Sequence, residues 1–511
     1  MRPLGASRVG RANGKLGASN IIVVGAGIGG LAAALDLSRR GASVTVLEKS
    51  GRPGGKMRRI DIQGQSIDSG PTVFTMPWIF EELFADAGLD LRERLSLHQS
   101  ELLARHAWTD GSTLDLFIDI DRSAEAIRAM AGAAEADRYR RFCERARRTY
   151  ETLYGTFMRR QRPSPFSLVA ATGFRGLIEL WNISPFRSLW RELGRAFEDP
   201  RLQGLFGRYA TYCGGSPLHS PATLMLVAHV EQCGVWRVEG GMQRLAETLV
   251  AAIEEKGGTV RFDADVAEIE TRDGRTSGVR LSNGEAIEAD AVVTNADVAG
   301  IRQGTLGRRA AAAVPRHRDH RRSLSAVTWS VVAETSGFEL AHHNVFFPVD
   351  YPREFTEIFD RHTLPSRPAV YVCRQDEPLI DPPGSASRLF LITNAPPAGD
   401  REAFDENAIG PVRNAVFELL ESCGLRLAFD SDQAVVQTPR DFEHRFPGTG
   451  GALYGSAPHG WRASFTRPGA RSRLPGLYFS GGSVHPGAGV PMTAISGRLA
   501  ATAVAEDLGL R

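Results

Sequence analysis

Glycines dominate the first stretch of the sequence that could do chemistry. The motif Gly25-Ala26-Gly27-Ile28-Gly29-Gly30 follows a short apolar run, 20–24, and precedes a helical pattern over 31–40. In such a turn, the first glycine permits a tight bend, the second admits a pyrophosphate, and the third lets helix and strand pack closely. The N-terminus of the helix offers N–H donors to the phosphates. The motif therefore predicts a dinucleotide site.

Glu48 extends this motif into a complete binding unit. It ends a second apolar run, 42–47, and lies 18 residues after Gly30, where a carboxylate can accept hydrogen bonds from a ribose. A glycine-rich turn that merely lies beside a strand is the alternative. The order strand, turn, helix, strand and acid favours the binding unit, although it does not separate NAD from FAD.

A second glycine pair favours FAD. The run Arg52-Pro53-Gly54-Gly55-Lys56 follows Glu48 closely, and Ile67-Asp68-Ser69-Gly70-Pro71-Thr72 comes next. Paired glycines allow the backbone to pass close to a cofactor, and the lysine places a cation near phosphate. A nicotinamide enzyme has no evident need for this second turn, although an ordinary surface turn is the alternative.

The C-terminal end of the chain carries a matching segment. A buried strand pattern over 476–480 runs into the glycine-rich turn 481–489 and then a helix of small residues over 493–507. The N-terminus of that helix could face a flavin ring and stabilise its charge on reduction. A further apolar strand, 290–296, also leads back toward the cofactor. The nucleotide-binding domain is therefore expected to be discontinuous, built from 19–100, 240–300 and 470–511.

The overall composition is that of a globular protein. The chain has 511 residues, a net charge of +2 and 42% apolar residues, which exclude global disorder and give no reason to expect nucleic acid as a partner. A mean hydropathy of −0.20 excludes a polytopic membrane protein. The cysteines are scattered and include no C-x-x-C, so a reducing compartment is expected, with no disulfide framework and no metal site. Residues 1–18 are expected to form a disordered tail.

An arginine-rich segment stands out against this balanced charge. Residues 138–162 hold nine arginines against Glu144 and Glu151, a local charge of +7, and aromatic residues follow over 157–190. Basic and aromatic residues together are typical of a surface that docks on anionic lipid, although a solvated helical face is the alternative. We therefore expect a helical lid and membrane-docking region over 101–239 and a substrate-binding domain over 301–469. The basic run 316–322 and the pair His342-His343 are predicted to be solvated loops.

These motifs together resemble a known family. The glycine turns, the segment Asp68-Ser69-Gly70-Pro71-Thr72-Val73, Gly234-Val235-Trp236 with Gly240-Gly241-Met242, and His485-Pro486-Gly487-Ala488-Gly489-Val490-Pro491 are similar to those of flavin-dependent carotenoid desaturases, which are related to bacterial phytoene desaturase. The passages 70–76, 449–455, 459–461, 464–471 and 482–486 look closest to the 1-hydroxycarotenoid 3,4-desaturases, or methoxyneurosporene desaturases, of phototrophic bacteria. The resemblance covers about residues 20 to 507.

The resemblance implies a fold and a set of flavin contacts. The expected fold is α/β, with a Rossmann-like FAD-binding domain of the amine-oxidase-like superfamily, an α+β substrate domain and a helical membrane-facing insertion. The residues predicted to bind FAD, from the resemblance and the motifs together, are Gly25, Ala26, Gly27, Gly29, Gly30, Glu48, Lys49, Arg52, Gly54, Gly55, Lys56, Thr72, Val266, Gly481, Gly482, Val490 and Met492.

The implied reaction is removal of two hydrogens from adjacent carbons of an acyclic carotenoid. Hydride transfer to flavin from a carbon allylic to the polyene leaves a cation that the conjugated chain itself delocalises, and proton loss completes the double bond. A strong general base is not obligatory, so the catalytic residues are unassigned; the weak candidates are His485, Glu231 and His219. A 1-hydroxycarotenoid would also need a hydrogen-bonding residue for its polar end, which the sequence does not identify.

Partners and alternatives follow from the same resemblance. We expect a cytoplasmic enzyme attached peripherally to the inner or photosynthetic membrane, with oxygen or a quinone as the electron acceptor. The alternatives are a phytoene or neurosporene desaturase, a carotenoid isomerase or saturase, an amine or porphyrinogen oxidase, and a prenyl-binding carrier without redox chemistry. The carrier is disfavoured because the cofactor glycines and Glu48 are present.

Overall fold

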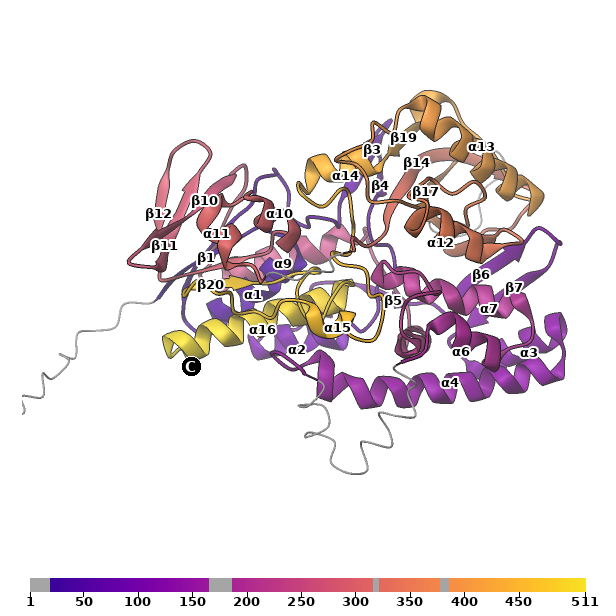
Figure 1. Cartoon of the computed structure of the whole chain (residues 1–511), viewed down its shortest axis with the longest axis horizontal. Helices are drawn as coiled ribbons and strands as arrows, with labels where there is room; N and C mark the ends of the chain where they lie inside the picture. The colour runs from indigo at the N-terminus through magenta and orange to yellow at the C-terminus, as the bar shows by residue number, and fades with distance from the viewer. Residues whose placement is uncertain (1–18, 165–185, 316–320, 377–385) are drawn as a thin grey trace, which may run out of the picture.

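The computed structural model describes residues 19–164, 186–315, 321–376 and 386–511 (Figure 1). The expected tail, 1–18, lies outside the described residues. The chain forms two lobes, with the C-terminus on the lobe that also holds the first strand (Figure 1). α4 (Ala133–Leu153) runs along the edge of the second lobe.

A parallel five-stranded sheet forms the core of the first lobe. Its strand order is β20-β13-β1-β2-β9, and every neighbouring pair is parallel. This sheet joins the three stretches from which a nucleotide-binding domain was expected, and the predicted α/β, Rossmann-like architecture is confirmed. The strands are β1 (Asn20–Val24), β2 (Ser43–Leu47), β9 (Thr259–Arg261), β13 (Ala291–Thr294) and β20 (Leu477–Phe479).

Both faces of this sheet are buried, which explains its unbroken apolar strands. In β1, Ile21 and Val23 pack into the core formed with α1, α9 and α16, whereas Ile22 and Val24 pack on the other face against β10, β11, α10 and α11. The period of two along a strand produces this division. The elements on the two faces are α1 (Ile28–Arg39), α9 (Gln243–Glu255), α16 (Val490–Leu508), β10 (Val266–Arg272), β11 (Arg275–Leu281), β12 (Ala286–Glu288), α10 (Val298–Gln303) and α11 (Gly307–Ala313).

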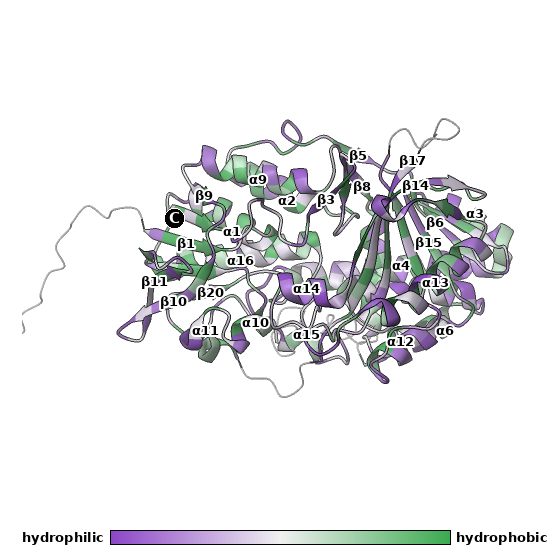
Figure 2. Ribbon diagram, turned by 90° about the horizontal axis from the view of Figure 1, so that it is seen from above, coloured by the Kyte–Doolittle hydropathy of each residue, from purple (hydrophilic) through white to green (hydrophobic). Residues whose placement is uncertain are grey.

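The second lobe contains a mixed sheet of eight strands. The order is β18-β14-β17-β16-β15-β6-β7, and β19 also pairs with β14. All pairs are antiparallel except β15 with β6. Figure 2 shows hydrophobic and hydrophilic residues mixed along the labelled strands of this sheet. The eight strands are β6 (Leu102–Trp108), β7 (Thr113–Phe117), β14 (Ser325–Ser336), β15 (His343–Phe347), β16 (Val370–Arg374), β17 (Ala386–Ala395), β18 (Arg426–Ala428) and β19 (Ala434–Gln437).

Two of these strands correct the expected domain boundaries. The region 101–239 was predicted to be a helical lid, but β6 and β7 come from its first residues and extend the eight-stranded sheet. β6 and β7 join this sheet because β6 pairs in parallel with β15. The paired residues are more than 230 positions apart in the sequence, so no local pattern predicts the contact. The prediction of helix is wrong for residues 102–117.

Helices and short strands complete both lobes. Around the second sheet lie α3 (Ile120–Ala131), α4, the π-helical turn η1 (Tyr154–Met158), α6 (Leu189–Ala196), α7 (Pro200–Gly207), η2 (Arg208–Cys213), η3 (Ala222–Met225), α8 (Leu226–Gln232), α12 (Tyr351–Phe359), α13 (Glu406–Ser422), η4 (Ser431–Gln433) and α14 (Pro439–Arg445). The remaining elements are α2 (Trp78–Asp86), α15 (Ala463–Thr466) and the two-stranded pairs β3 (Arg59–Ile62) with β4 (Gln65–Asp68) and β5 (Leu97–Gln99) with β8 (Trp236–Val238).

The arginine-rich segment is less basic in the folded protein than its sequence implies. Six of its nine arginines lie in ion pairs, and the partners include acids from other elements, such as Glu192 of α6 and Glu82 of α2. The charge of +7 counts only the acids of the segment itself, and acids outside the segment offset part of it in the folded protein. The paired arginines are Arg138, Arg140, Arg145, Arg147, Arg148 and Arg159.

Glu354 of α12 gives the second lobe a testable pH dependence. Its buried carboxylate accepts hydrogen bonds from the Ala369 N–H at 2.8 Å and from Asn394 Nδ2 at 2.6 Å, and burial raises its pKa to about 7. The pKa of an unfolded Glu is about 4.3, so between these values the folded state holds a proton that the unfolded state has lost. This contribution to stability is lost as the pH rises through 7.

Replacing Glu354 by glutamine is therefore expected to stabilise the folded protein, relative to wild type, most strongly at high pH. Relative to wild type, the variant's free energy of unfolding should rise by roughly 2 kcal/mol between pH 5.5 and pH 8, measured by urea denaturation. Glu357, one turn along α12, is the matched control because its pKa is lowered; E357Q should be destabilised equally at both pH values. An identical pH slope in wild type and E354Q would contradict the assignment.

Candidate active site

The glycine-rich turns predicted from the sequence meet at one place. A Cβ atom on Gly29 would lie 2.9 Å from the backbone N of Gly481, so the first turn touches the C-terminal one. The second turn arrives from the other side: Gly54 bridges to Gly27, and its N–H donates to the carbonyl of Ala26 at 2.9 Å. Backbone therefore approaches backbone from three separate stretches of chain, as expected where a cofactor is to be enclosed.

Asn295 lies at the centre of these turns and was not among the predicted contacts. It follows β13 directly, at the carboxyl end of a central parallel strand, where ligands of such sheets bind. A Cβ on Gly27 would come within 2.4 Å of its Nδ2, and its buried Oδ1 has no hydrogen-bond partner among the described residues. A buried polar atom without a partner is costly, so it indicates a ligand that donates to it.

Glu48 lies beside the first turn, as predicted. Its buried carboxylate accepts from the Ala26 N–H at 2.7 Å and from Ser50 Oγ at 2.5 Å. A carboxylate has further lone pairs, so it can still accept hydroxyl donors from a ribose. Val266 begins β10 and is buried in the core cluster that also contains Val24. It therefore supports this end of the sheet.

The predicted basic residues separate into two groups. Lys56 is half-buried, its Nζ donates to the carbonyl of Leu453 at 2.5 Å, and burial lowers its pKa, with Asp297 acting in the opposite direction. Lys49 and Arg52 are exposed instead: Lys49 donates to the carbonyl of Arg445, and Arg52 lies 3.8 Å from Asp61. Only Lys56 among these three extends inward.

The C-terminal turn is held in place by an arginine. Arg467 donates to the carbonyl of Gly482 at 2.8 Å and also to those of Tyr454 and Ser456. The N–H of Gly481 donates to Ser496 Oγ of α16 at 3.1 Å, which fixes the turn to the helix that follows it. Val490 and Met492 lie in the first turn of that helix and pack against the core of the first lobe.

These contacts fit FAD. The glycine turns leave no room for side chains, Glu48 lies where a ribose is expected, Asn295 offers an unused acceptor, and α1 and α16 point their N-termini toward the same turns. A dinucleotide needs backbone N–H groups for phosphate together with an acid for the ribose, and both are present here.

His485 is placed as a structural residue. Its buried ring donates from Nε2 to the carbonyl of Phe157 at 3.0 Å and packs edge-on against the Phe157 ring. Burial lowers its pKa to about 4, so the ring is neutral at pH 7. The interaction joins the C-terminal turn to η1. His219, the second weak catalytic candidate, is exposed and lies 3.9 Å from Asp360.

Glu231, the third candidate, lines a cavity in the second lobe. Its carboxylate accepts from the hydroxyls of Tyr209 at 2.7 Å and Tyr212 at 2.6 Å, and burial raises its pKa. The structure thus separates the three candidates from one another. The cavity is lined by Val73, Leu103, Ala104, His106, Leu205, Arg208, Tyr209, Tyr212, Glu231, Val235, His343, Val345 and Tyr371.

The cavity adjoins the predicted cofactor residue Thr72. Thr72 Oγ1 and the hydroxyl of Tyr371 are 2.6 Å apart, and that hydroxyl is also 2.7 Å from Nδ1 of His343. Val73, the next residue after Thr72, forms part of the cavity wall. A cavity lined by apolar and polar side chains in similar number therefore lies directly against a segment expected to contact flavin.

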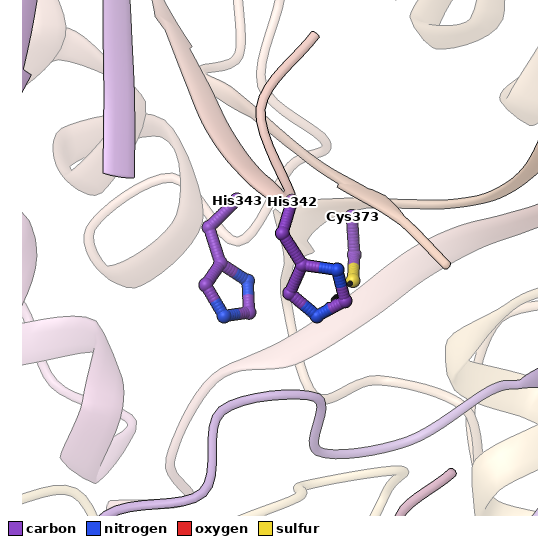
Figure 3. A group of neighbouring side chains, drawn as sticks. All are labelled: His342, His343 and Cys373. Carbon is purple, nitrogen blue, oxygen red and sulfur yellow. Dashed lines mark hydrogen bonds between the residues drawn. The ribbon is translucent and has the colours of Figure 1, made fainter. Parts of the chain in front are cut away.

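His342, His343 and Cys373 form a group near this cavity (Figure 3). Their potential ligand atoms lie within 4.8 Å of one another. The predicted solvated loop is wrong for His343, which is buried in β15. The positive charges of Arg208 and Arg237 oppose a cation here, and burial raises the pKa of the Cys373 thiol to about 12. Charge and thiol acidity therefore both disfavour a metal.

A search of the described residues for membrane-crossing helices finds none with the necessary length and apolar character.

Comparison with known proteins gives a consistent result. A sequence profile of the family described as flavin containing amine oxidoreductase matches residues 28–505. The chain is 51% identical to the hydroxyneurosporene desaturase of Rubrivivax gelatinosus over 96% of this chain and 93% of that protein. It is 42% identical to the hydroxyneurosporene desaturase of Cereibacter sphaeroides, over 96% and 98% of the two chains. Among solved structures, an oxidoreductase from Methanosarcina mazei superposes with a TM-score of 0.59 at 17% identity, covering 95% of this chain and all of that one.

Proposed function

Because the chain belongs to the flavin-containing amine oxidoreductase family and is an FAD-dependent oxidoreductase, we propose that it desaturates an acyclic carotenoid. The most specific form of the proposal is 3,4-desaturation of a 1-hydroxy- or 1-methoxy-carotenoid. The 51% identity to a hydroxyneurosporene desaturase across nearly the whole length of both chains carries it. The apolar part of the cavity beside Thr72, with Val73, Val235 and Val345, is compatible with a hydrocarbon chain.

The protein's own part in this reaction is mainly positioning. FAD, when bound, supplies the acceptor for the hydride removed from the substrate. Gly25–Gly30, Glu48, Lys56 and Gly482 would hold it between the two ends of the chain. The walls of the cavity exclude water and align the polyene, whose conjugation spreads the positive charge that develops on it.

Proton removal places little demand on these side chains. His485 donates its Nε2 hydrogen to a carbonyl, and Glu231 accepts from two tyrosine hydroxyls, so both already have partners. A proton beside an extended polyene cation is acidic enough to leave without a strong base. We therefore assign no general base, and orientation supplies most of the rate enhancement.

Pigment analysis in a carotenoid-accumulating host tests the function. The protein is expressed in cells that accumulate neurosporene or lycopene, and in parallel in cells that accumulate their 1-hydroxy derivatives. We expect a product lighter by two hydrogens and red-shifted in absorption only from the hydroxylated pool, identified by mass spectrometry. Conversion of the unhydroxylated pool would replace the specific proposal by desaturation of neurosporene or lycopene, and no conversion of any pool would refute carotenoid desaturation.

Peripheral membrane attachment is the second part of the proposal. The substrate dissolves in the bilayer, so the enzyme must reach it there. Phe186 is 62% exposed, packs against Trp461 with ring centroids 5.4 Å apart, and directly follows the aromatic stretch that lies outside the described residues. Because six neighbouring arginines are already paired, we attribute attachment chiefly to apolar contact and less to charge.

Flotation with liposomes tests this attachment. F186S is expected to reduce the bound fraction, with a partition coefficient lower by roughly 30-fold, because a buried phenylalanine contributes about 2 kcal/mol. The matched control is V349S, which removes an apolar side chain that is 87% exposed elsewhere on the second lobe. Equal liposome binding by F186S and V349S would show that Phe186 is not part of the docking surface. Strong suppression of liposome binding by salt would show that the arginines contribute most of the attachment.

A further inference from the structure

Arg208 is the unusual member of the cavity wall. It begins η2, lies deep in the second lobe, and keeps part of its surface toward the cavity that it lines. Its guanidinium lies over the rings of Tyr371 and Tyr212, at 5.3 Å and 5.5 Å from their centroids. Two aromatic faces thus hold the cation in a fixed orientation. One part of the wall is apolar and includes Val73, Leu205, Val235 and Val345, whereas tyrosines, histidines and Glu231 line the rest.

The hydrogen-bonding capacity of Arg208 is mostly unused. A guanidinium carries five N–H donors. Within the described ranges, the hydrogen bond of Arg208 is a long one, 3.5 Å to the hydroxyl of Tyr212, and no carboxylate lies within ion-pair distance. Deep donors without acceptors are unfavourable unless something that enters the cavity accepts from them. The cavity therefore presents a cation with free donors to whatever occupies it.

The negative charge that balances Arg208 is on Glu231, and one side chain, that of Tyr212, lies between them. Tyr212 accepts from Arg208 and donates to Glu231, and Tyr209 donates to the same carboxylate. Glu231 is thus close enough to balance the charge but does not occupy the donors themselves. This chain of contacts keeps Arg208 charged and aimed into the cavity, so Tyr212 and Glu231 act as positioning residues.

We propose that Arg208 binds the oxygen of the terminal hydroxyl or methoxy group of the carotenoid and thereby selects oxygenated ends over plain hydrocarbon ends. The inference rests on the proposed function and adds the residue that recognises the polar end. An ether or tertiary alcohol oxygen is an acceptor at the end of an apolar chain, which matches the cationic donor of Arg208 beside the apolar part of the cavity wall. Arg208 is here a specificity residue and takes no part in moving hydrogen.

The position of Arg208 agrees with the site of reaction. In a 1-hydroxycarotenoid the oxygen is carried by C1, only two carbons from C3, so the polar anchor must lie close to the flavin. Arg208 stacks on Tyr371, Tyr371 is hydrogen-bonded to Thr72, and Thr72 belongs to the segment expected to contact flavin. Anchoring the end group here would set which carbon pair faces the cofactor.

Binding to the flavin-loaded protein tests the proposal separately from turnover. The dissociation constants of 1-hydroxyneurosporene and neurosporene in detergent micelles are measured by quenching of tryptophan fluorescence. Wild type is expected to bind the hydroxylated carotenoid between roughly ten- and a hundredfold more tightly, as a charged donor on a buried oxygen would give. In R208M the ratio of the two dissociation constants should fall to within about threefold of one. Only the affinity for the hydroxylated carotenoid should be lost.

Matched variants keep the test interpretable. R191M removes an exposed arginine of α6 that does not line the cavity, so its preference should stay as in wild type. Flavin absorbance and a melting curve establish that each variant is folded. Where R208M fails that check, R208Q takes its place with the same expected loss, because its shorter neutral amide cannot supply the charged donor.

Two results overturn the inference and leave the proposed function in place. The first is an equal preference for the hydroxylated carotenoid in wild type and in R208M, including the case in which neither protein shows a preference. The second is an equal loss of affinity for both carotenoids in the variant. Failure of wild type to bind or convert either carotenoid refutes the proposed function itself.

Discussion

Replacement of Gly30 by valine is expected to give a protein that no longer holds flavin. A Cβ atom at this position would lie 2.1 Å from the carbonyl oxygen of Gly25 and 3.2 Å from Cγ1 of Val23. The first of these is backbone of the turn that must receive the pyrophosphate, so no side-chain rotation relieves the clash. The start of α1 would have to move away from β1, and its N–H groups would leave the phosphate site.

The effect should be large and specific. We expect G30V to lose more than 100-fold in flavin affinity, measured by flavin absorbance after dialysis, and to show no desaturation. G194A is the matched control, because a Cβ on Gly194 in α6 meets nothing within 4 Å and the residue is helical. That variant should retain flavin and melt at or slightly above the wild-type temperature. Full flavin loading in G30V would disprove the assignment of this turn.

The turns that meet at the candidate site were largely predictable because their signals are local. Glycines at fixed spacing, an acid at the end of the next strand and a small-residue helix after a glycine-rich turn each require only a short stretch of sequence. The meeting of Gly29 with Gly481 was predictable as well, because both follow strands of one parallel sheet. Asn295 was missed although its signal was present: a polar residue directly after the buried strand 291–294.

What the sequence did not reveal depends on contacts between distant residues. The arginines of α4 looked like a basic patch because their partners Glu192 and Glu82 lie on other elements. Local composition cannot report such pairing. The Arg208 cluster is invisible for the same reason: it combines η2, α8, β15 and β16, which meet only when the second lobe is folded.

Arg467 shows how one distant contact can join two predicted segments. It lies in the stretch 464–471 and reaches the carbonyls of Tyr454, Ser456 and Gly482, so it links the loop before α15 to the C-terminal glycine turn. Burial lowers its pKa, with Cys213 and Asp297 acting in the opposite direction. The guanidinium is the right group for this role, because its fixed fork of donors can serve several carbonyls at once.

Replacement of Arg467 by leucine is therefore expected to destabilise the protein and loosen its flavin. Three carbonyl oxygens would lose their donor, and each unsatisfied group costs about 1–3 kcal/mol, so the total should be roughly 3–5 kcal/mol. R467L should melt at least about 5 °C below wild type and lose flavin during gel filtration, because Gly482 is no longer held. The melting temperature of R467K should lie between those of wild type and R467L, since one ammonium cannot reach every carbonyl.

R462L, which removes an exposed arginine stacked on Trp461, is the control and should melt at the wild-type temperature. If R467L matches R462L in melting temperature and flavin content, the C-terminal turn is held by its own backbone and the helix that follows it.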